Sequence, residues 1–238
     1  MKFGIIAAGE GSRLLNEGIH IPKPLVPING TTMLRRLINV FTNCGADEIF
    51  VIINGTSGFT SNYLHELKNT VSVPLRIIEK TTESSLHSFY EIVRTINDDK
   101  FCVTTVDTIF KEEEFYCMIN SFIRGCEDGV MGVTSYVDDE KPLFISTDKN
   151  MYINGFLDSS IDNTEFVSGG IYCLTRKSLP TLERCIGGGV SRMRNFQRYL
   201  VEDGLRLKAY PFTKILDVDH AGDIEKAELF LKGEYTDD

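Results

Sequence analysis

The feature that most constrains the fold of this chain is a short apolar run that leads directly into a glycine-rich loop. Residues Phe3–Ala8 are apolar, and Gly9 and Gly11 follow at once. A short apolar run that ends in a turn is typical of a strand buried inside a parallel sheet. Because helices cover both faces of such a sheet, the start of the chain already favours an α/β fold.

The loop after this run has the composition of a phosphate-binding turn. Gly9 and Gly11 allow the backbone to approach a ligand closely, and the N–H groups of such a turn form a concavity that binds anions. Arg13 adds a planar guanidinium suited to phosphate oxygens. We therefore expect the loop to bind a nucleotide through Ala8, Gly9, Gly11, Ser12 and Arg13.

A second cation follows in the segment Pro22-Lys23-Pro24. The two prolines restrict the backbone on both sides, so we expect Lys23 to project from a stiff, extended segment. Arg13 and Lys23 then supply two fixed cations, as a bound triphosphate requires. The sequence does not match two other glycine-rich phosphate-binding motifs. A Walker loop needs a Gly-Lys pair, and none follows Gly11; a dinucleotide-binding loop needs a third glycine, and Leu14 stands in its place. The pattern therefore disfavours an oxidoreductase.

Beyond the loop, the apolar pattern predicts a sheet flanked by helices. Strands and helices alternate in the first half, whereas strands joined by Asp, Asn and Gly turns dominate the second half. We expect one domain over residues 1–238, with a Rossmann-like, mostly parallel sheet and a β-rich insertion. The expected strands are Phe3–Ala8, Glu48–Ile53, Leu75–Glu79, Phe101–Val106, Val130–Val137, Leu143–Ser146, Tyr152–Leu157, Phe166–Leu174, Leu205–Tyr210 and Ile215–Val218. The expected helices begin near Thr32 and Ser84 or span about Glu112–Ile123, Arg192–Glu202 and Ile224–Leu231.

Composition narrows the classes of partner. With 42% hydrophobic residues and a formal net charge of -9, the chain lacks the broad basic surface that grips nucleic acid or an anionic membrane. No apolar stretch approaches the roughly 20 residues needed to span a bilayer, and the first residues do not form a secretory leader. We therefore expect a cytoplasmic protein with reduced cysteines and no nucleic-acid or membrane partner. A homo-oligomer is compatible with this composition.

Acidic residues follow two of the expected strands, where a metal ion could bind. Asp107 ends the strand Phe101–Val106, at the carboxyl edge where ligands bind in open α/β sheets. Asp217 and Asp219 alternate along a later strand and can point into one pocket. Magnesium takes few protein ligands and keeps several waters. We therefore expect Mg²⁺ at Asp107 together with Asp217, and Asp219 is the alternative to Asp217.

The segment AAGEGSRL…PKPLVPING resembles the N-terminal signature of the sugar-phosphate nucleotidyltransferases, or NDP-sugar pyrophosphorylases, and of the related small cytidylyltransferases. The resemblance implies a nucleotide-diphospho-sugar transferase fold, with a nucleotide-binding half over about 1–125 and an acceptor-binding half over about 126–238. Asp107 stands where the family carries a metal-binding Asp, although Val106 replaces the usual glycine before it.

The family's closing strand–helix unit matches residues 217–224. Asp217 corresponds to the metal ligand of the sugar type and Asp219 to that of the cytidylyl type. Asp223 is expected to be a helix N-terminal charge. His220 replaces a threonine, and it either contacts a phosphate or satisfies a loop carbonyl.

Two segments depart from the family pattern at the sites of substrate recognition. Ser84-Ser85 stands where relatives carry Gly-Thr-Ala beside the nucleotide base, and this difference favours the cytidylyl type. The small serine side chains and the N-terminus of the helix that follows still allow a nucleotide to approach the backbone closely. Gly169 and Gly170 match the glycine-bearing acceptor strand, where they either contact the acceptor or form a bulge in an edge strand. The acceptor-binding Glu-Lys pair of the sugar type is missing, and the candidate replacements are Lys214 and Arg194.

The resemblance implies that an acceptor phosphate attacks the α-phosphorus of an NTP in line and releases pyrophosphate. Arg13 would hold the β- and γ-phosphates, Lys23 would draw the acceptor and α-phosphates together, and Mg²⁺ would neutralise charge. No general base is needed, because a phosphate monoester is already anionic near neutral pH.

The expected acceptor is a sugar 1-phosphate, which gives an NDP-sugar. A first alternative is cytidylyl transfer to phosphocholine or another small phosphorylated alcohol. A second, of another class, is a non-catalytic nucleotide-sensing domain. A cationic acceptor would need aromatic and acidic groups, for which the candidates are Tyr136, Tyr152, Phe156 and Asp158.

Overall fold

The first strand, β1 (Lys2–Ala7), lies in the middle of a row of parallel strands. It pairs with β4 (Glu48–Ile53) on one side and with β6 (Lys100–Thr105) on the other, and β5 (Leu75–Glu79) pairs with β4. These pairings confirm the buried parallel strand expected at the start of the chain. The computed structural model describes residues 1–138, 140–161 and 164–235.

The sheet changes direction at β11 (Phe166–Thr175), which runs antiparallel to β6. On its other side β11 pairs with β8 (Gly129–Thr134), which pairs in parallel with β12 (Leu207–Phe212). The start of β11 pairs with β9 (Phe144–Thr147), and β9 pairs with β10 (Ile153–Leu157). Within the described ranges, nine strands thus form one sheet in the order β10-β9-β11-β6-β1-β4-β5, with β8 and β12 branching from β11. A parallel nucleotide-binding row and a β-rich insertion are both as the sequence predicts.

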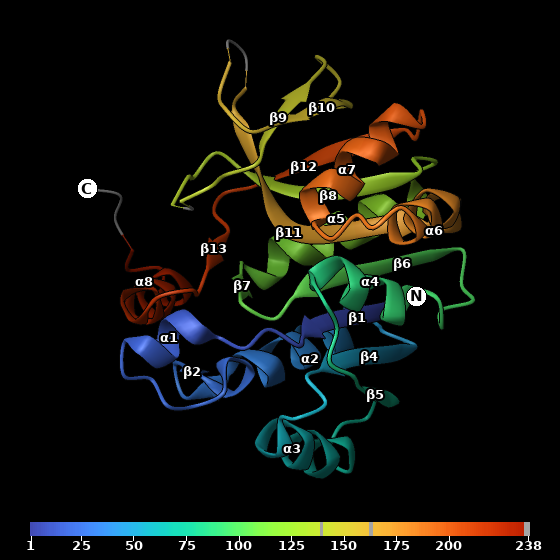
Figure 1. Ribbon diagram of the computed structural model, residues 1–238. Helices are drawn as coiled ribbons and strands as arrows, with labels where there is room; N and C mark the ends of the chain where they lie inside the picture. Colours follow the sequence, from blue (N-terminus) through green and yellow to red (C-terminus); the bar gives the residue numbers. More distant parts are fainter. Residues whose placement is uncertain (139, 162–163, 236–238) are drawn as a thin grey trace.

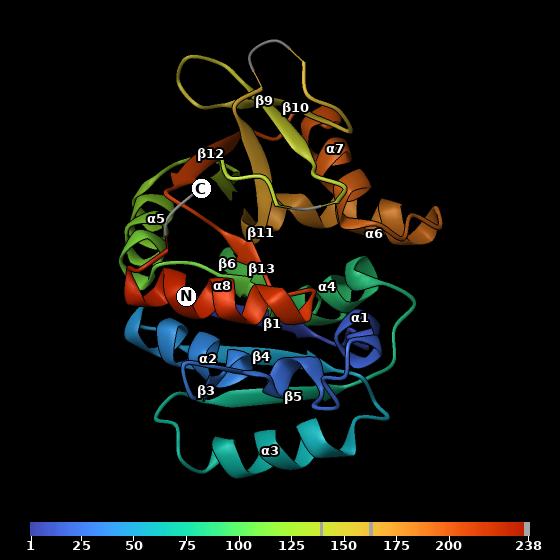
Figure 2. The ribbon, with the colours of Figure 1, turned by 90° about the vertical axis from the view of Figure 1, so that its left-hand side faces the viewer.

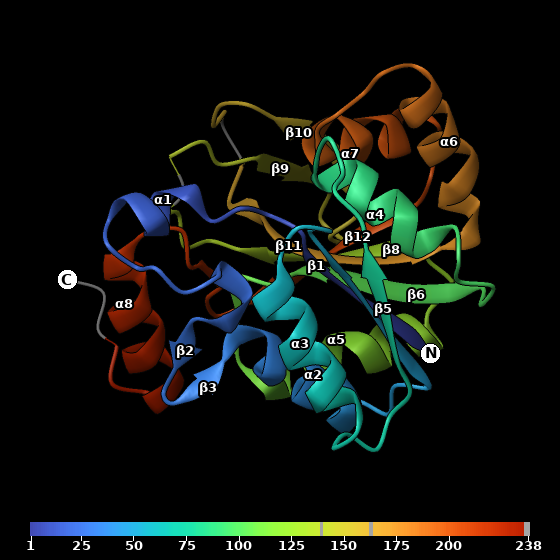
Figure 3. The same ribbon diagram turned by 60° about the horizontal axis from the view of Figure 1, so that its bottom comes forward.

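Helices cover both faces of this sheet. Those that pack on the face carrying Phe3 and Ile5 are α2, α3, α5 and α8, whereas α4, α6 and α7 pack on the face carrying Ile6. Figure 3 shows these groups on opposite sides of the sheet, and Figures 1 and 2 show β9 and β10 at the end opposite α3. The helices are α1 (Ser12–Asn16), α2 (Met33–Asn43), α3 (Gly58–Lys68), α4 (Ser85–Val93), α5 (Glu112–Arg124), α6 (Leu179–Gly187), α7 (Met193–Glu202) and α8 (Ala221–Lys232).

Two short ladders complete the fold. They join β2 (Pro27–Ile28) to β3 (Thr31–Thr32) and β7 (Thr108–Ile109) to β13 (Leu216–Asp217). The second ladder connects the middle of the chain to its last strand, and it positions the acidic residues of the site.

The structure differs from the sequence-based expectation in a few elements. The helices α1, α3 and α6 are additional; α3 buries only Thr60, Leu64 and Leu67, and so sparse an apolar stripe does not stand out from a loop. The strand expected over Val130–Val137 ends at Thr134, whose hydroxyl accepts a hydrogen bond from the N–H of Tyr136 in the turn that follows. In the part of the chain that the structure describes, every helix is too short or too polar to cross a membrane.

Candidate active site

The glycine loop packs directly against the segment that carries Lys23. Gly11 has φ +63°, a left-handed conformation that glycine adopts without strain. A Cβ at Gly11 would lie 2.7 Å from Lys23 Cβ, so only glycine allows the two segments to approach this closely. Residues Lys23–Leu25 form a short 3-10 helix, and the expectation of an extended backbone at Lys23 is therefore wrong. Pro24 fits this helix because the first turn of a helix needs no N–H from it.

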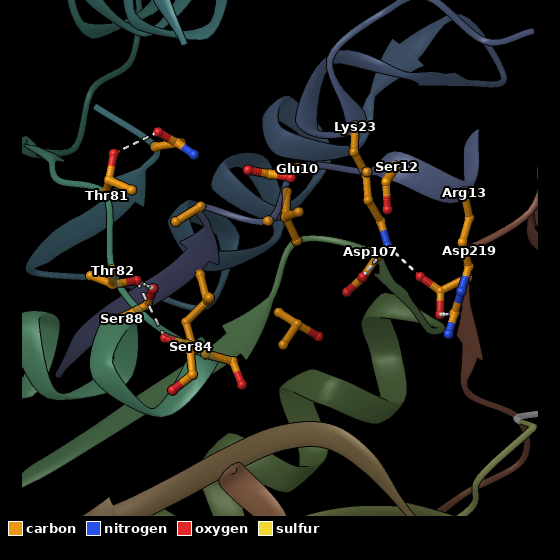
Figure 4. Close-up of a pocket in the computed structure, with 18 of the residues that line it drawn as sticks. Glu10, Ser12, Arg13, Lys23, Thr81, Thr82, Ser84, Ser88, Asp107 and Asp219 are labelled. Atoms are coloured by element: carbon orange, nitrogen blue, oxygen red, sulfur yellow. Dashed lines mark hydrogen bonds and ion pairs between the residues drawn. The ribbon is translucent and has the colours of Figure 1, made fainter. Parts of the chain in front are cut away.

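The ammonium of Lys23 lies between two carboxylates. Its Nζ is 2.5 Å from Asp107 Oδ2 and 2.6 Å from Asp219 Oδ1, and only 11% of the side chain is exposed (Figure 4). Burial alone would lower the pKa of Lys23, but the charges and hydrogen bonds of the two carboxylates outweigh burial and raise this pKa above its ordinary value. Lys23 is therefore a permanent positive charge in the site.

Arg13 extends this charged network toward solvent. Its Nη1 is 2.8 Å from Asp219 Oδ2, and 51% of its side chain is exposed. Burial alone would raise the pKa of Asp219, but the hydrogen bond from Lys23 and the charges of Lys23 and Arg13 outweigh burial and hold this pKa below its usual range. The structure thus brings together both predicted catalytic cations and two of the three predicted metal ligands (Figure 4).

The ladder between β7 and β13 brings Asp107 and Asp219 together. Asp217 lies opposite Thr108 in this ladder, and the N–H of Val218 donates to the carbonyl of Asp107 at 3.1 Å. The register of this ladder places Asp219 beside Lys23. Asp217 lines two neighbouring cavities instead, so the alternating acids do not occupy equivalent places.

A cavity of about 560 Å³, here called the nucleotide cavity, runs from these charges along the glycine loop to the start of α4. The hydroxyls of Thr82 and Ser88 lie 2.6 Å apart at its far end, and Thr81 donates to Asn54 Oδ1 at 2.8 Å. These four polar residues were not among those predicted to bind the nucleotide, although Asn54 directly follows β4 at the ligand-binding edge of the sheet. The seven residues predicted to bind the nucleotide all line the cavity: Ala8, Gly9, Gly11, Ser12, Arg13, Ser84 and Ser85.

A smaller cavity of about 400 Å³, here called the second cavity, meets the nucleotide cavity at Ser85, Thr105 and Asp107. Its walls come from β11, from the start of α7 and from the loop before β9. This arrangement places a separate binding space directly beside the charged network.

Gly169 and Gly170 form a bulge in β11, which has partners on both sides and is therefore not the edge strand considered from the sequence. Gly170 has φ +71°, and a Cβ there would lie 2.9 Å from Thr108 Oγ1. A Cβ at Gly169 would lie 2.3 Å from Ile215 Cδ1. The positive φ and the two threonine hydroxyls require glycine at position 170, whereas a Cβ at Gly169 would displace the end of the Ile215 side chain. Gly170 also lines the second cavity, and contact with an acceptor stays a prediction.

His220 and Asp223 fasten the start of α8. His220 Nδ1 is 2.5 Å from Glu17 Oε1, and the N–H groups of Asp219 and His220 donate to Asp223 Oδ2 at 3.1 and 2.8 Å. The helix-terminal role expected for Asp223 is confirmed. His220 has a carboxylate partner rather than a loop carbonyl, and it lines a third cavity with Asp217 and Asp219.

The two candidate replacements for the acceptor lysine lie in different places. Lys214 is buried, with its Nζ 3.9 Å from the ring centroids of both Tyr136 and Tyr235. Arg194 lines the second cavity and is 3.0 Å from Asp158 Oδ1. Of the two, Arg194 is the one placed to meet an acceptor.

The residues predicted to bind a cationic acceptor do not form a common pocket. Tyr152 accepts a hydrogen bond from Arg206, Phe156 is buried in the core, and Asp158 is paired with Arg194. Tyr136 lines the third cavity instead. This part of the sequence-based expectation is wrong, because strand pairing separates residues that are close in the sequence.

Comparison with known proteins identifies the reaction class. The model of the MobA-like NTP transferase domain family matches residues 4–200. The 2-aminoethylphosphonate cytidylyltransferase of Lancefieldella rimae is 27% identical over 115 residues, which cover 47% of this chain and 45% of that protein. The match therefore spans less than half of the relative.

Solved structures show the same fold. The inositol-1-phosphate CTP transferase from T. maritima matches with a TM-score of 0.80 and 17% identity, covering 98% of this chain and 95% of that chain. The UTP-bound UGPase from Acinetobacter baumannii matches with a TM-score of 0.80 and 16% identity, covering 98% and 94%. The expected nucleotide-diphospho-sugar transferase fold is confirmed.

Proposed function

We propose that this chain, which belongs to the MobA-like NTP transferase family, transfers CMP from CTP to a small phosphorylated or phosphonylated acceptor. Its family makes it a nucleotidyltransferase. The observation that carries the proposal is the ammonium of Lys23, held between Asp107 and Asp219 where the nucleotide cavity meets the second cavity.

In the proposed reaction, the backbone of the glycine loop and Arg13 bind the β- and γ-phosphates. Lys23 stabilises the negative charge shared by the α-phosphate and the incoming acceptor phosphate. An acceptor oxygen attacks the α-phosphorus in line, the bond from that phosphorus to the bridging oxygen breaks, and pyrophosphate leaves. The protein positions and neutralises the reactants and forms no covalent bond.

The donor set fits a magnesium ion. Within the described residues no group of three or more His, Cys, Asp or Glu is arranged to bind a metal, but Mg²⁺ in nucleotide sites takes only one or two carboxylates and completes its shell with phosphates and water. We propose Asp107 and Asp219 as these ligands, because both line the nucleotide cavity and share one cation. When bound, Mg²⁺ would neutralise triphosphate charge.

Cytidine is supported by two relatives and by the base end of the cavity. One relative is named a cytidylyltransferase and another a CTP transferase. The small hydroxyl residues Thr82, Ser84 and Ser88 replace the glycine-bearing segment expected for the sugar type.

Transfer to a sugar 1-phosphate is the second candidate function, because β11 carries Gly169 and Gly170, which match the family's glycine-bearing acceptor strand. A non-catalytic sensing role is disfavoured, since Lys23, Asp107 and Asp219 form a complete charged network. Location in the cytoplasm and the absence of nucleic-acid and membrane partners stay predictions from the sequence.

The test is pyrophosphate release from each of the four NTPs, with a panel of sugar 1-phosphates and small phosphorylated or phosphonylated alcohols. We expect the highest turnover with CTP and none after chelation of divalent metal. Lys23→Ala should lower kcat by a factor of about 10²–10³, whereas Lys68→Ala, at an exposed position of α3, should not. Unchanged turnover in both Lys23→Ala and Asp107→Ala would contradict the mechanism.

A further inference from the structure

We propose that the acceptor substrate carries a second anionic group, a carboxylate or a second phosphate, which the second cavity binds away from the reacting phosphate. The inference rests on the proposed nucleotidyl transfer and names the class of acceptor for that reaction. Two observations support the inference. One is a cluster of cations, and the other is a pair of buried side chains, each with one hydrogen-bond donor that has no partner among the described residues.

The second cavity opens directly off the catalytic charges. Asp107 lines both cavities, whereas Lys23 lines the nucleotide cavity and not the second cavity. An acceptor whose phosphate reaches Lys23 and Asp107 therefore extends its remaining atoms into the second cavity. The groups that line this cavity therefore indicate which chemical groups the rest of the acceptor carries.

Cations lie at the end of the second cavity that is remote from the nucleotide. Lys141, Arg192 and Arg194 line it, and the same three residues line an open depression on the molecular surface beyond it. Arg194 and Arg198 share one carboxylate, Asp158, at 3.0 and 2.7 Å. Arg192 is exposed and has no carboxylate partner among the described residues. In a chain with a net charge of -9, this local excess of guanidinium groups matches a carboxylate or a phosphate.

Two buried polar side chains face the second cavity with an unused donor. Gln197 is 2% exposed and accepts a hydrogen bond from Ser168 at 3.0 Å, and its amide nitrogen donates to no residue that the structure describes. Tyr172 is 6% exposed, and its hydroxyl has no hydrogen-bond partner in the described ranges. Neither donor is a fully buried atom, so both are accessible from the second cavity. A ligand with acceptor oxygens supplies the partners that these two donors lack.

The hydroxyl of Tyr172 remains protonated at neutral pH. Burial raises the pKa of Tyr172, and the charges of Asp217 and Asp107 raise it further, opposed by the charge of Arg194. Tyr172 therefore offers a hydrogen-bond donor in the wall of the second cavity, which Asp107 and Arg194 also line.

Helix α7 holds the cationic end in place. Arg192 precedes its first residue, and its first turn contains no acidic residue, so the positive end of the helix dipole adds to the attraction for an anion. Arg198 donates to the carbonyl of Phe156 in β10 at 3.0 Å, and Arg194 donates to the carbonyl of Lys141 at 2.8 Å. The first bond ties α7 to β10 and the second ties it to the loop before β9; Figure 1 shows α7 and β10 at the same end of the molecule.

This arrangement disfavours acceptors that end in a cation. The ammonium of phosphocholine or of 2-aminoethylphosphonate would face guanidinium groups, and like charges repel more strongly where water is partly excluded. An uncharged sugar would leave Arg192 without a carboxylate or phosphate partner among the described residues. An acceptor with an anion at each end can place its reacting phosphate at Lys23 and its second anion at the cationic end of the second cavity.

The test measures binding of matched acceptors by titration calorimetry, in the presence of Mg²⁺ and a non-hydrolysable CTP analogue. Glycerol 3-phosphate is compared with 3-phosphoglycerate, which replaces an alcohol by a carboxylate. Glucose 1-phosphate is compared with glucose 1,6-bisphosphate, which adds a phosphate. We expect the second member of at least one pair to bind about tenfold tighter or more, and the pair that shows this preference identifies the anion.

Variants locate the binding group. Arg192→Gln should abolish the preference within the pair, whereas Arg124→Gln, an exposed arginine at the end of α5, should preserve it. Equal affinity within both pairs, no measurable binding of the doubly anionic compounds, or a preference that survives Arg192→Gln would each overturn the inference. The proposed function fails on a separate readout, pyrophosphate release by the wild type and by Lys23→Ala, so the two failures are distinguishable.

Discussion

Lys23 Nζ and Asp107 Oδ2 meet at 2.5 Å, although one residue follows the glycine loop and the other follows a strand in the middle of the sheet. Asp219, which follows the last strand, lies 2.6 Å from the same ammonium. Two carboxylates so close to a triphosphate site repel the substrate unless further positive charge accompanies it. The ion pairs thus give a physical reason for the magnesium requirement that we propose.

The first prediction separates the two candidate metal ligands of the last strand. Asp219→Asn should raise the Mg²⁺ concentration that gives half-maximal pyrophosphate release, because Asp219 lines the nucleotide cavity. Asp217→Asn should leave this concentration unchanged, because Asp217 lines the second and third cavities and not the nucleotide cavity. A larger shift in Mg²⁺ dependence for Asp217→Asn would assign the metal to Asp217 instead.

The second prediction concerns the contact between the glycine loop and Lys23. Gly11→Ala should lower kcat about a hundredfold, the effect of displacing a reacting group by about 1 Å, because the new Cβ would lie 2.7 Å from Lys23 Cβ. The matched control is Gly18→Ala, which also has a positive φ, +91°, but has nothing within 4 Å of its added Cβ. Both variants should lose roughly 1–2 kcal/mol of unfolding free energy from left-handed strain. Equal loss of activity in the two would show that strain, and not the contact with Lys23, is responsible.

The nucleotide half of the site could be predicted from the sequence because its chemistry is local. The glycine loop and Lys23 lie within one short stretch, and Asp107 follows a strand whose apolar pattern is clear. The sequence favours Asp217 over Asp219 as the second acidic residue of the site, whereas Asp219 is the one that lies beside Lys23. The choice depends on the register of a ladder of two residues per strand, which is too short to leave a pattern in the sequence.

The second cavity could not be predicted, because no local pattern connects its parts. Tyr172 comes from β11, Lys141 from a loop, and Arg192 and Gln197 from the start of α7. Their proximity depends on the pairing of β9, β10 and β11 and on how α7 packs against them. Arg194 is a candidate from the sequence, but the carboxylate that it shares with Arg198 is evident only in the structure.

The third prediction tests the aromatic part of the core. Phe115 is fully buried, and its ring stacks on Phe41 and Phe110 at centroid distances of 5.5 and 4.8 Å. Phe115→Ala should lower the unfolding free energy in urea by about 3–5 kcal/mol, since it leaves a cavity. The neighbouring Tyr116 is 51% exposed, and Tyr116→Ala should change it by no more than about 0.5 kcal/mol. Similar losses in the two variants would contradict the assigned burial.

The fourth prediction concerns the pH dependence of the link between α8 and the loop after α1. His220 Nδ1 lies 2.5 Å from Glu17 Oε1, and Glu17 Oε2 accepts a hydrogen bond from the N–H of Ala221 at 2.6 Å. The hydrogen bond to Glu17 raises the pKa of His220, and burial opposes it only in part. The folded pKa therefore exceeds the unfolded value of about 6.5. Stability from the pair is fully present below about pH 6.5 and is lost as the pH rises through the folded pKa.

His220→Gln should accordingly lower the urea midpoint at about pH 6, where His220 is charged in both states, and have a much smaller effect at about pH 9. The pKa of Glu17 is lowered by its hydrogen bonds to Ala221 and His220, so its carboxylate stays ionised across this range. The control is His20→Gln, which removes an exposed histidine that has no ion pair among the described residues and should change the midpoint equally at both pH values. An effect of His220→Gln that is as large at about pH 9 as at about pH 6 would show that its role in capping α8, rather than its charge, stabilises the link.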